Sequence, residues 1–281
     1  MAQFTVHSRG VALSGEEAGE GPAVLLLHGL TATRRYVVMG SKLLERSGHR
    51  VIAYDARGHG RSSRAPAPQD YSYELLAQDA LAVLDDRGVE RAVLAGASMG
   101  AHTLLSVALR HPDRVAGLVV ITPAYSGDPA VEAARLERWD RLSEGLRTGG
   151  IDGFMRVYGT PAGADPAFAK TIETVTRQRL AQHADLDALA DALHALPRTQ
   201  PFGALDELAA ISAPTIVVAS NDRADPEHPH ALAVQYARQI PGSRLVTDPP
   251  GRSPIAWQGS QLSRLIAELV AVCGLSSKRR A

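Results

Sequence analysis

Residues 92–105 read Ala92-Val93-Leu94-Ala95-Gly96-Ala97-Ser98-Met99-Gly100-Ala101-His102-Thr103-Leu104-Leu105. The stretch starts with an apolar run typical of a buried β-strand, continues as Gly-x-Ser-x-Gly and then becomes rich in alanine and leucine, as in a helix. A sharp strand-to-helix turn brings the residues two positions before and after its tip close together, and only glycine lacks the Cβ that would collide. The spacing therefore predicts Ser98 at the tip of a strained turn, between Gly96 and Gly100.

This turn has the pattern of a nucleophile elbow, in which a serine is exposed between a strand and a helix. The N–H groups in the first turn of a helix have no acceptor within the helix, so they can stabilise negative charge that develops on a substrate. The pentapeptide alone is also compatible with a tight connection that has no catalytic role. Features elsewhere in the chain are needed to decide between a nucleophile elbow and a turn without a catalytic role.

Apolar runs recur along the chain and alternate with helical patterns. Both faces of these runs are apolar, as expected for central strands of a parallel sheet. The runs cover residues 22–30, 50–54, 115–121 and 214–219, and a short strand is predicted over 244–247. Residues 4–7 and 11–14 are predicted to form a hairpin, and helices are predicted over 37–47, 73–87, 231–239 and 259–272. This alternation predicts an α/β fold with a doubly wound, mostly parallel sheet.

The strand pattern stops between residue 124 and about residue 205, where apolar residues recur at helical spacing. Such a segment, set between two halves of an α/β pattern, predicts a helical insertion. We expect a core domain made of residues 1–123 and 206–281, interrupted by a helical cap made of residues 124–205.

The composition limits the partners of the chain. Its 281 residues include 30 basic and 30 acidic side chains, so no net charge favours nucleic acid or an anionic membrane. The single cysteine, Cys273, cannot form an internal disulfide, and from the sequence we expect neither a signal peptide nor a membrane-spanning segment. We expect a cytoplasmic monomer or homodimer with a small-molecule substrate. Because the sequence contains no metal-ligand cluster, phosphate loop or dinucleotide fingerprint, we expect no metal and no cofactor.

Three motifs occur in order, each at the end of a predicted strand: Leu25-Leu26-Leu27-His28-Gly29, Asp55-x-Arg57-Gly58-His59-Gly60-x-Ser62 and Gly96-x-Ser98-x-Gly100. Together they resemble the α/β-hydrolase fold family, and most of all its capped bacterial esterases and lactonases. The resemblance covers nearly the whole chain. It implies that the backbone N–H groups of Leu30 and Met99 form an oxyanion hole. It also implies that the side chains of His28, Asp55, Arg57 and His59 hold loops in place.

The resemblance places a catalytic acid in the loop after the strand over residues 214–219. Asp222 and Asp225 compete for this position, and the acid would orient a histidine and stabilise its imidazolium form. We favour Asp225. Either residue could instead be a polar loop residue or a charge at a helix N-terminus.

The histidine that the family pattern requires is missing. It should follow the last short strand, but that part of the chain reads Pro250-Gly251-Arg252-Ser253-Pro254, and no histidine follows His230. A guanidinium group such as that of Arg252 has a pKa above ~12 and cannot accept a proton at neutral pH, although it can bind an anion. Loss of the base would reduce the rate by roughly 10⁴- to 10⁶-fold. We therefore predict that His228 or His230 replaces it, unless both are surface residues at the start of the next helix.

The remaining histidines are given structural roles. His102, one helical turn after Ser98, is predicted to lie in the core, and His111, His183 and His194 are predicted to be surface or helix-end residues. Four other side chains are candidates for contact with substrate, although packing would explain the aromatic ones equally well: Arg252, Trp257, Trp139 and Tyr158.

The favoured hypothesis is a serine hydrolase that acts on a carboxylic ester or lactone through an acyl-enzyme on Ser98. Asp225 or Asp222 would be the acid and His228 the relocated base. One alternative is a non-hydrolytic, lyase-like enzyme in which Arg252 holds an anionic substrate. Another is a ligand-binding protein in which Ser98 no longer reacts.

Overall fold

The central strand of the sheet, β5 (Ala92–Ala97), leads directly to Ser98. The computed structural model describes residues 1–159, 166–222, 225, 227–248 and 257–275. Within them β5 belongs to an eight-stranded sheet of order β1-β2-β4-β3-β5-β6-β7-β8. The strands are β1 (Ala2–Ser8), β2 (Val11–Ala18), β3 (Ala23–Leu27), β4 (Arg50–Tyr54), β5, β6 (Val115–Ile121), β7 (Thr215–Ala219) and β8 (Arg244–Thr247).

The six strands from β4 to β8 in this order are parallel to their neighbours, whereas β1 and β2 form an antiparallel hairpin that joins the edge of β4. All residues of β3, β6 and β7 are buried, as the apolar runs in the sequence predict. The hairpin and the doubly wound, mostly parallel sheet are thus confirmed. Parallel strands place their carboxyl ends at one edge of a sheet, which is the edge where ligands bind in such folds.

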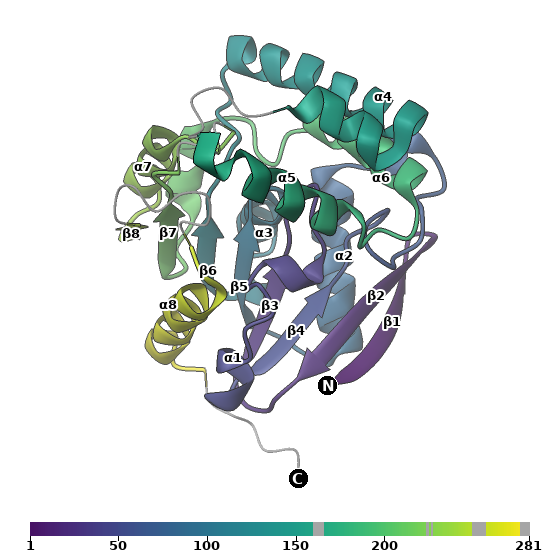
Figure 1. Cartoon of the computed structure of the whole chain (residues 1–281). Helices are drawn as coiled ribbons and strands as arrows, with labels where there is room; N and C mark the ends of the chain where they lie inside the picture. The colour runs from purple at the N-terminus through teal and green to yellow at the C-terminus, as the bar shows by residue number, and fades with distance from the viewer. Residues whose placement is uncertain (160–165, 223–224, 226, 249–256, 276–281) are drawn as a thin grey trace.

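Helices cover both faces of the sheet (Figure 1). They are α1 (Leu43–Arg46), α2 (Tyr73–Asp86), α3 (Met99–Arg110), α4 (Pro129–Tyr158), α5 (Pro166–Leu180), α6 (Leu186–Ala195), α7 (His230–Gln239) and α8 (Gly259–Val272). Successive residues of β5 face opposite sides. Leu94 therefore joins one buried cluster with residues of α2 and α3, whereas Val93 joins a second with residues of α1 and α8.

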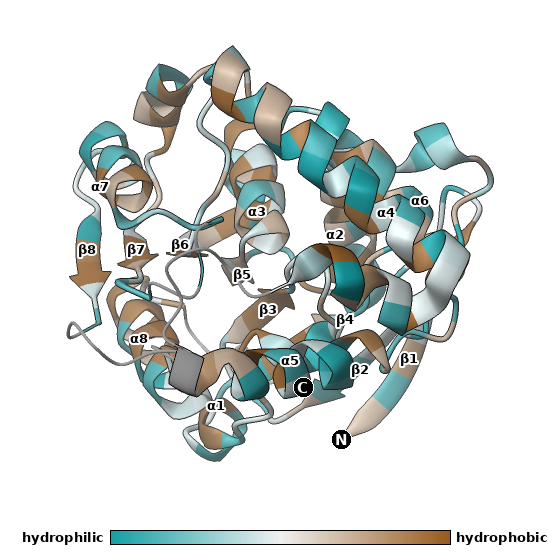
Figure 2. Cartoon of the chain, turned by 45° about the horizontal axis from the view of Figure 1, so that its top comes forward, coloured by the Kyte–Doolittle hydropathy of each residue, from teal (hydrophilic) through white to brown (hydrophobic). Residues whose placement is uncertain are grey.

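Three helices, α4, α5 and α6, lie between β6 and β7 in the chain and cross the carboxyl-end edge of the sheet (Figure 1). The backbone of α4 leaves helical geometry at Gly149 and Gly150, and Gly150 has a φ of 56°. The carbonyl of Gly145 would lie 1.9 Å from a Cβ on Gly153, so a side chain there would clash with the backbone. In Figure 2 strands such as β3 and β7 are coloured hydrophobic, whereas α4 and α5 carry hydrophilic segments, as expected for helices with one exposed face.

The helix predicted over residues 37–47 is wrong. The structure has a short 3₁₀ helix, η1 (Arg34–Tyr36), then turns, and only four helical residues in α1. The break has a local cause, because Met39 has a φ of 48° and Gly40 a φ of 74°. These left-handed conformations interrupt a right-handed helix whatever the apolar pattern around them.

Candidate active site

Ser98 occupies the turn between β5 and α3, as the sequence predicts. Its φ of 51° and ψ of −112° lie in a region that non-glycine residues rarely adopt, and such conformations cost about 1–3 kcal/mol each. The turn is held from both sides. The Ser98 N–H donates to the carbonyl of Ile121 at the end of β6, and the Ser98 carbonyl accepts from the N–H of His102, both at 3.0 Å.

The two glycines of the motif are required by close backbone contacts. A Cβ on Gly96 would lie 2.4 Å from the carbonyl carbon and oxygen of Gly100. A Cβ on Gly100 would lie 2.0 Å from the carbonyl oxygen of Leu27 and 2.9 Å from that of His28. The crowding expected from the spacing is therefore present, and it ties the elbow to the end of β3.

The segment after β3, residues 28–31, runs beside Ser98, and we call it the oxyanion loop. A Cβ on Gly29 would lie 3.6 Å from the Cβ of Ser98. Leu30 and Met99 are both buried, and Met99 starts α3, where backbone N–H groups have no acceptor within the helix. The loop and the helix start thus both lie next to the serine, while the oxyanion role of the two amides stays a prediction.

His28 holds the oxyanion loop against the end of β4. Its Nε2 accepts the N–H of Ala56 at 2.9 Å, so Nδ1 carries the proton and donates to the carbonyl of Gly29 at 2.9 Å. Burial, followed by the charge of His59, lowers the pKa of His28 to about 3. Because the His28 ring is neutral and both of its nitrogens are hydrogen-bonded, its role is structural.

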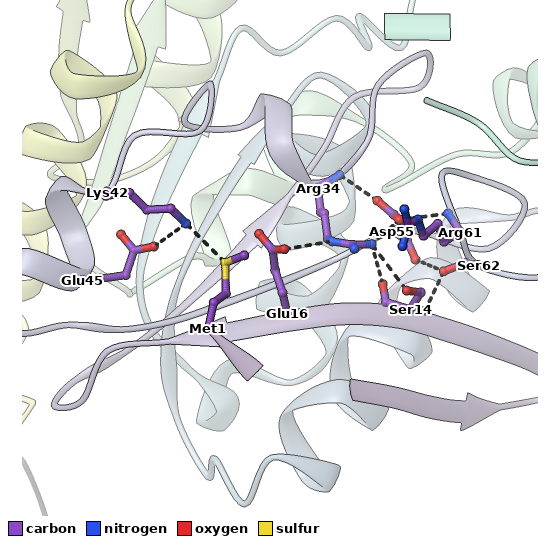
Figure 3. Close-up of polar contacts among 9 residues, drawn as sticks. All are labelled: Met1, Ser14, Glu16, Arg34, Lys42, Glu45, Asp55, Arg61 and Ser62. Carbon is purple, nitrogen blue, oxygen red and sulfur yellow. Dashed lines mark hydrogen bonds and ion pairs between the residues drawn. The ribbon is translucent and has the colours of Figure 1, made fainter. Parts of the chain in front are cut away.

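The loop after β4 is fixed by its own charged residues. Asp55 accepts the backbone N–H groups of Arg34 at 2.9 Å and Arg61 at 3.0 Å, and it pairs with the guanidinium of Arg34 (Figure 3). The guanidinium of Arg57 donates twice to Asp79, at 2.8 Å each, with both side chains buried. A polar hollow lined in part by Glu16, Arg34, Lys42 and Asp55 lies on this side of the molecule, and Ser98 does not line it.

Asp225 and His228 form a hydrogen-bonded pair. The Nδ1 of His228 lies 2.7 Å from Oδ2 of Asp225, and the backbone N–H of His228 donates to the Asp225 carbonyl at 3.3 Å, so both residues belong to one turn. The backbone N–H of Asp222 donates to Oγ of Ser220 at 3.1 Å, and its carbonyl accepts the N–H of Asp225 at 3.2 Å. Of the two candidate acids, Asp225 is thus the one with a hydrogen bond to His228.

The pair is arranged so that His228 gains basicity. Burial pulls the pKa of His228 down, but the charge and hydrogen bond of Asp225, together with Glu227, outweigh burial and raise it above its ordinary value. Burial alone would raise the pKa of Asp225. The charge and hydrogen bond of His228 and the charge of Arg179 outweigh burial and lower this pKa below its ordinary value. The His228 side chain is 18% exposed and that of Asp225 42% exposed, so water moderates both effects.

His102 lies in the core, one helical turn after Ser98. It is buried, its Nε2 accepts the N–H groups of Ala124 and Tyr125 at 3.0 Å each, and its Nδ1 lies 3.0 Å from the hydroxyl of Tyr73. Burial, then the charges of Arg135 and His228, lowers its pKa well below the ordinary value. His102 is therefore a neutral core residue, as predicted, and His228 lies close enough to influence it electrostatically.

Three other predicted residues, His230, Trp257 and Trp139, lie in different parts of the structure. His230 is at the start of α7, with its Nε2 3.2 Å from Oγ1 of Thr247. The indole N–H of Trp257 donates to the carbonyl of Ala219 at the end of β7, at 2.8 Å. Trp139 packs against the larger buried cluster, and its indole nitrogen is buried without a hydrogen-bond partner among the described residues.

Tyr158 and Arg252 complete the set of predicted contacts. The Tyr158 ring stacks on Phe154, and the guanidinium carbon of Arg138 lies 5.7 Å from the ring centroid. Burial raises the pKa of Tyr158, and the charge of Asp225 acts in the same direction. Arg252 lies outside the described residues, and its predicted role stays a prediction.

His183 lies just after the end of α5, as a helix-end residue would, but the prediction that it is a surface residue is wrong. The side chain is buried, with its Nδ1 3.0 Å from the N–H of Gly60 and its Nε2 3.3 Å from the carbonyl of Thr31. It follows α5 and reaches two loops of the core that are distant in sequence. No local pattern in the sequence signals this contact, because it depends on how the cap helices pack.

Comparison with known proteins agrees with this geometry. Residues 22–152 match the family model described as alpha/beta hydrolase fold. Over 101 residues the chain is 40% identical to the mouse "sn-1-specific diacylglycerol lipase ABHD11", covering 36% of this chain and 32% of that protein. Over 108 residues it is 38% identical to "Epoxide hydrolase B" of Mycobacterium tuberculosis, covering 38% of this chain and 30% of that protein. The chain thus spans about a third of these curated relatives.

The likeness to a solved structure extends further. A thermophilic esterase from Thermogutta terrifontis superimposes with a TM-score of 0.78 at 26% identity, covering 97% of this chain and 99% of that one. The eight-stranded sheet and the serine at its elbow define an α/β-hydrolase architecture. The chain has the α/β-hydrolase fold, and its structural neighbours include esterases.

The described part of the chain contains neither a helix suited to span a membrane nor a cluster of metal-binding side chains. None of its helices has both the length and the apolar character needed to cross a membrane. Within the same residues, no three histidine, cysteine, aspartate or glutamate side chains are grouped so that they could bind a metal ion.

Proposed function

We propose that this protein is a serine hydrolase that acts on a carboxylic ester or lactone of a small molecule through an acyl-enzyme on Ser98. The observation that carries the proposal is the strained conformation of Ser98, with φ of 51° and ψ of −112°, at the end of the central strand. Backbone strain of this kind persists where the surrounding structure enforces it, and it clusters at active sites. Here the enforcing contacts are those of Gly96 and Gly100.

The identity of the nucleophile favours acyl chemistry over opening of an epoxide. Attack of a serine Oγ on an ester or lactone carbonyl gives an acyl-enzyme that water can hydrolyse. Attack of the same oxygen on an epoxide carbon would give an ether, which water does not cleave under these conditions. We therefore assign this chain an ester or lactone substrate, even though some relatives are named epoxide hydrolases.

Asp225 and His228 are the acid and base of the proposed mechanism. In the first step His228 accepts the proton of Ser98 as Oγ attacks the carbonyl carbon, while the Leu30 and Met99 amides stabilise the oxyanion. His228 then donates this proton to the leaving alcohol. Water, deprotonated by His228, attacks the acyl-enzyme and releases the acid. The 2.7 Å contact between Asp225 and Nδ1 would leave Nε2 free to exchange protons.

The position of the loop after β7, at the same edge of the sheet as Ser98, supports a base supplied by this loop. β6 pairs with both β5 and β7, and strands in a sheet are about 4.8 Å apart, so the elbow and the loop after β7 start about 10 Å from each other. In our proposal the His228 side chain spans this gap to reach Ser98. Trp139, Tyr158, Trp257 and Arg252 stay candidates for substrate contact.

The decisive experiment is labelling of the purified protein with a fluorophosphonate, with the modified peptide identified by mass spectrometry. We expect an adduct on Ser98, none in Ser98→Ala, and much slower labelling in His228→Ala than in His230→Ala. A folded wild-type protein that gives no adduct would refute the proposal. Equal labelling of the two histidine variants would refute His228 as the base.

A further inference from the structure

The oxyanion loop is held by three histidines that come from three parts of the chain. The carbonyl of Gly29 accepts from Nδ1 of His28 at 2.9 Å. The carbonyl of Leu30 lies 2.8 Å from Nε2 of His59, and that of Thr31 lies 3.3 Å from Nε2 of His183. Each of three successive carbonyls therefore has its own imidazole partner. His28 and His59 belong to motifs of the core, whereas His183 belongs to the connection between α5 and α6.

The protonation of His183 follows from its partners. Its Nδ1 accepts the N–H of Gly60 at 3.0 Å, so the ring proton is on Nε2 and is donated to Thr31. Burial, with the charge of His59, lowers the pKa of His183 to about 3, so the ring is neutral at ordinary pH and keeps this tautomer. The backbone N–H of Ala184 donates to the carbonyl of Gly60 at 2.8 Å, which fixes the same connection a second time.

Two peptide groups link His183 to the predicted oxyanion donor. The Thr31 carbonyl that His183 binds shares a planar peptide group with the N–H of Ala32. That N–H donates to the carbonyl of Gly29 at 2.9 Å. The Gly29 carbonyl in turn shares its peptide plane with the N–H of Leu30. Rotation of the first plane would weaken the hydrogen bond that sets the second, and so would change the direction of the Leu30 amide.

We propose that His183 is a positioning residue that couples the cap to the oxyanion hole by fixing the peptide groups that orient the Leu30 amide. The inference rests on the proposed function, since an oxyanion hole matters only if Ser98 forms a tetrahedral intermediate. The cap thus contributes to transition-state stabilisation without contact with the substrate. Displacement of residues 180–185 would remove this restraint on the orientation of the Leu30 amide.

Two substitutions separate the two hydrogen bonds of His183. The side-chain oxygen of asparagine can take the place of Nδ1 and accept from Gly60, and the side-chain nitrogen of glutamine can take the place of Nε2 and donate to Thr31. We compare His183→Ala, His183→Asn and His183→Gln with the wild type. His194→Ala is the matched control, because His194 is a cap histidine that is exposed and pairs with Asp140.

Steady-state hydrolysis of a p-nitrophenyl ester gives the first measurement. A displacement of ~1 Å at a catalytic group costs up to ~100-fold in rate, so we expect kcat to fall about 10- to 100-fold in His183→Ala and His183→Asn with little change in KM. His183→Gln and His194→Ala should retain a kcat close to that of the wild type. If His183→Asn and His183→Gln have the same kcat, the positioning role is wrong and His183 is only a packing residue.

Hydrogen exchange read by mass spectrometry gives a second measurement that does not need activity. We expect peptides covering residues 29–32 to exchange faster in His183→Ala and His183→Asn but not in His183→Gln. The Gly60 amide should instead stay protected in His183→Asn and exchange faster in His183→Gln. Unchanged exchange of residues 29–32 in His183→Ala would overturn the proposal. If instead the wild type neither hydrolyses esters nor reacts with fluorophosphonate, the proposed function fails, while exchange still decides whether His183 fixes the loop.

Discussion

Replacement of Gly100 by alanine tests whether the elbow depends on close approach of two backbones. The added Cβ would stand 2.0 Å from the Leu27 carbonyl oxygen and 2.4 Å from its carbon, an overlap of more than ~1 Å relative to ordinary contact. Both atoms belong to the buried strand β3, so no flexible side chain can move aside. Overpacking of this kind costs about 1–3 kcal/mol, and we expect a value at the upper end of that range.

The expected consequences are a less stable protein and a misplaced nucleophile. A loss of about 3 kcal/mol would lower the melting temperature by roughly 6–12 °C in a chain of this size class, and a shift of ~1 Å at Ser98 would reduce labelling by fluorophosphonate about 100-fold. Thermal unfolding followed by circular dichroism and labelling kinetics measure the two effects.

Gly29→Ala is the matched control for this prediction. Its Cβ would lie 3.5 Å from the Ala97 carbonyl oxygen and 3.6 Å from the Cβ of Ser98, which is ordinary contact. We expect its stability to stay within about 0.5 kcal/mol of the wild type. If Gly100→Ala is as stable and as reactive as the wild type, the reasoning about the elbow is refuted.

Three further predictions follow from the charged groups. The acid limb of kcat/KM should report the pKa of His228, because only the neutral imidazole accepts a proton; activity should rise with pH, with a midpoint above the ordinary histidine value. Asp225→Asn removes the charge that favours imidazolium, so pH profiles should show the midpoint at lower pH and a lower plateau, and an unmoved midpoint would contradict the pairing. Asp79→Asn leaves the buried guanidinium of Arg57 without its counter-charge and should cost about 3–5 kcal/mol in urea unfolding, whereas a change below ~1 kcal/mol would show that the pair is not important for stability.

The sequence predicts best those features that depend on local spacing. Gly96 and Gly100 predict the elbow because a Cβ at either position collides with backbone. The buried parallel strands are predicted because both faces of each run are apolar. Asp225 and His228 are three residues apart, and a hydrogen bond from the His228 N–H to the Asp225 carbonyl brings their side chains together. The three-residue spacing is readable without a structure, whereas the hydrogen bond that favours Asp225 over Asp222 is not.

Features that depend on packing between distant segments are not predictable in this way. His183 lies in a polar connection, and nothing around it indicates burial against Thr31 and Gly60, which are more than a hundred residues away. The helix expected over residues 37–47 fails for a related reason. Its apolar residues do face the core, but Val37 and Val38 do so from turns and Leu44 from the short helix α1, because Met39 and Gly40 adopt left-handed conformations between them.

The position of the Asp225–His228 pair makes a functional elbow compatible with the missing histidine. In this fold the nucleophile is fixed by the central strand, and the base has only to reach it from some loop at the same edge of the sheet. The β7 loop ends at the same edge as the elbow, one strand beyond β6, whose Ile121 carbonyl holds the Ser98 N–H. A base supplied from this loop therefore needs no change in the sheet, the elbow or the oxyanion loop. In our proposal, this geometry lets the strained serine react although no histidine follows His230 in the sequence.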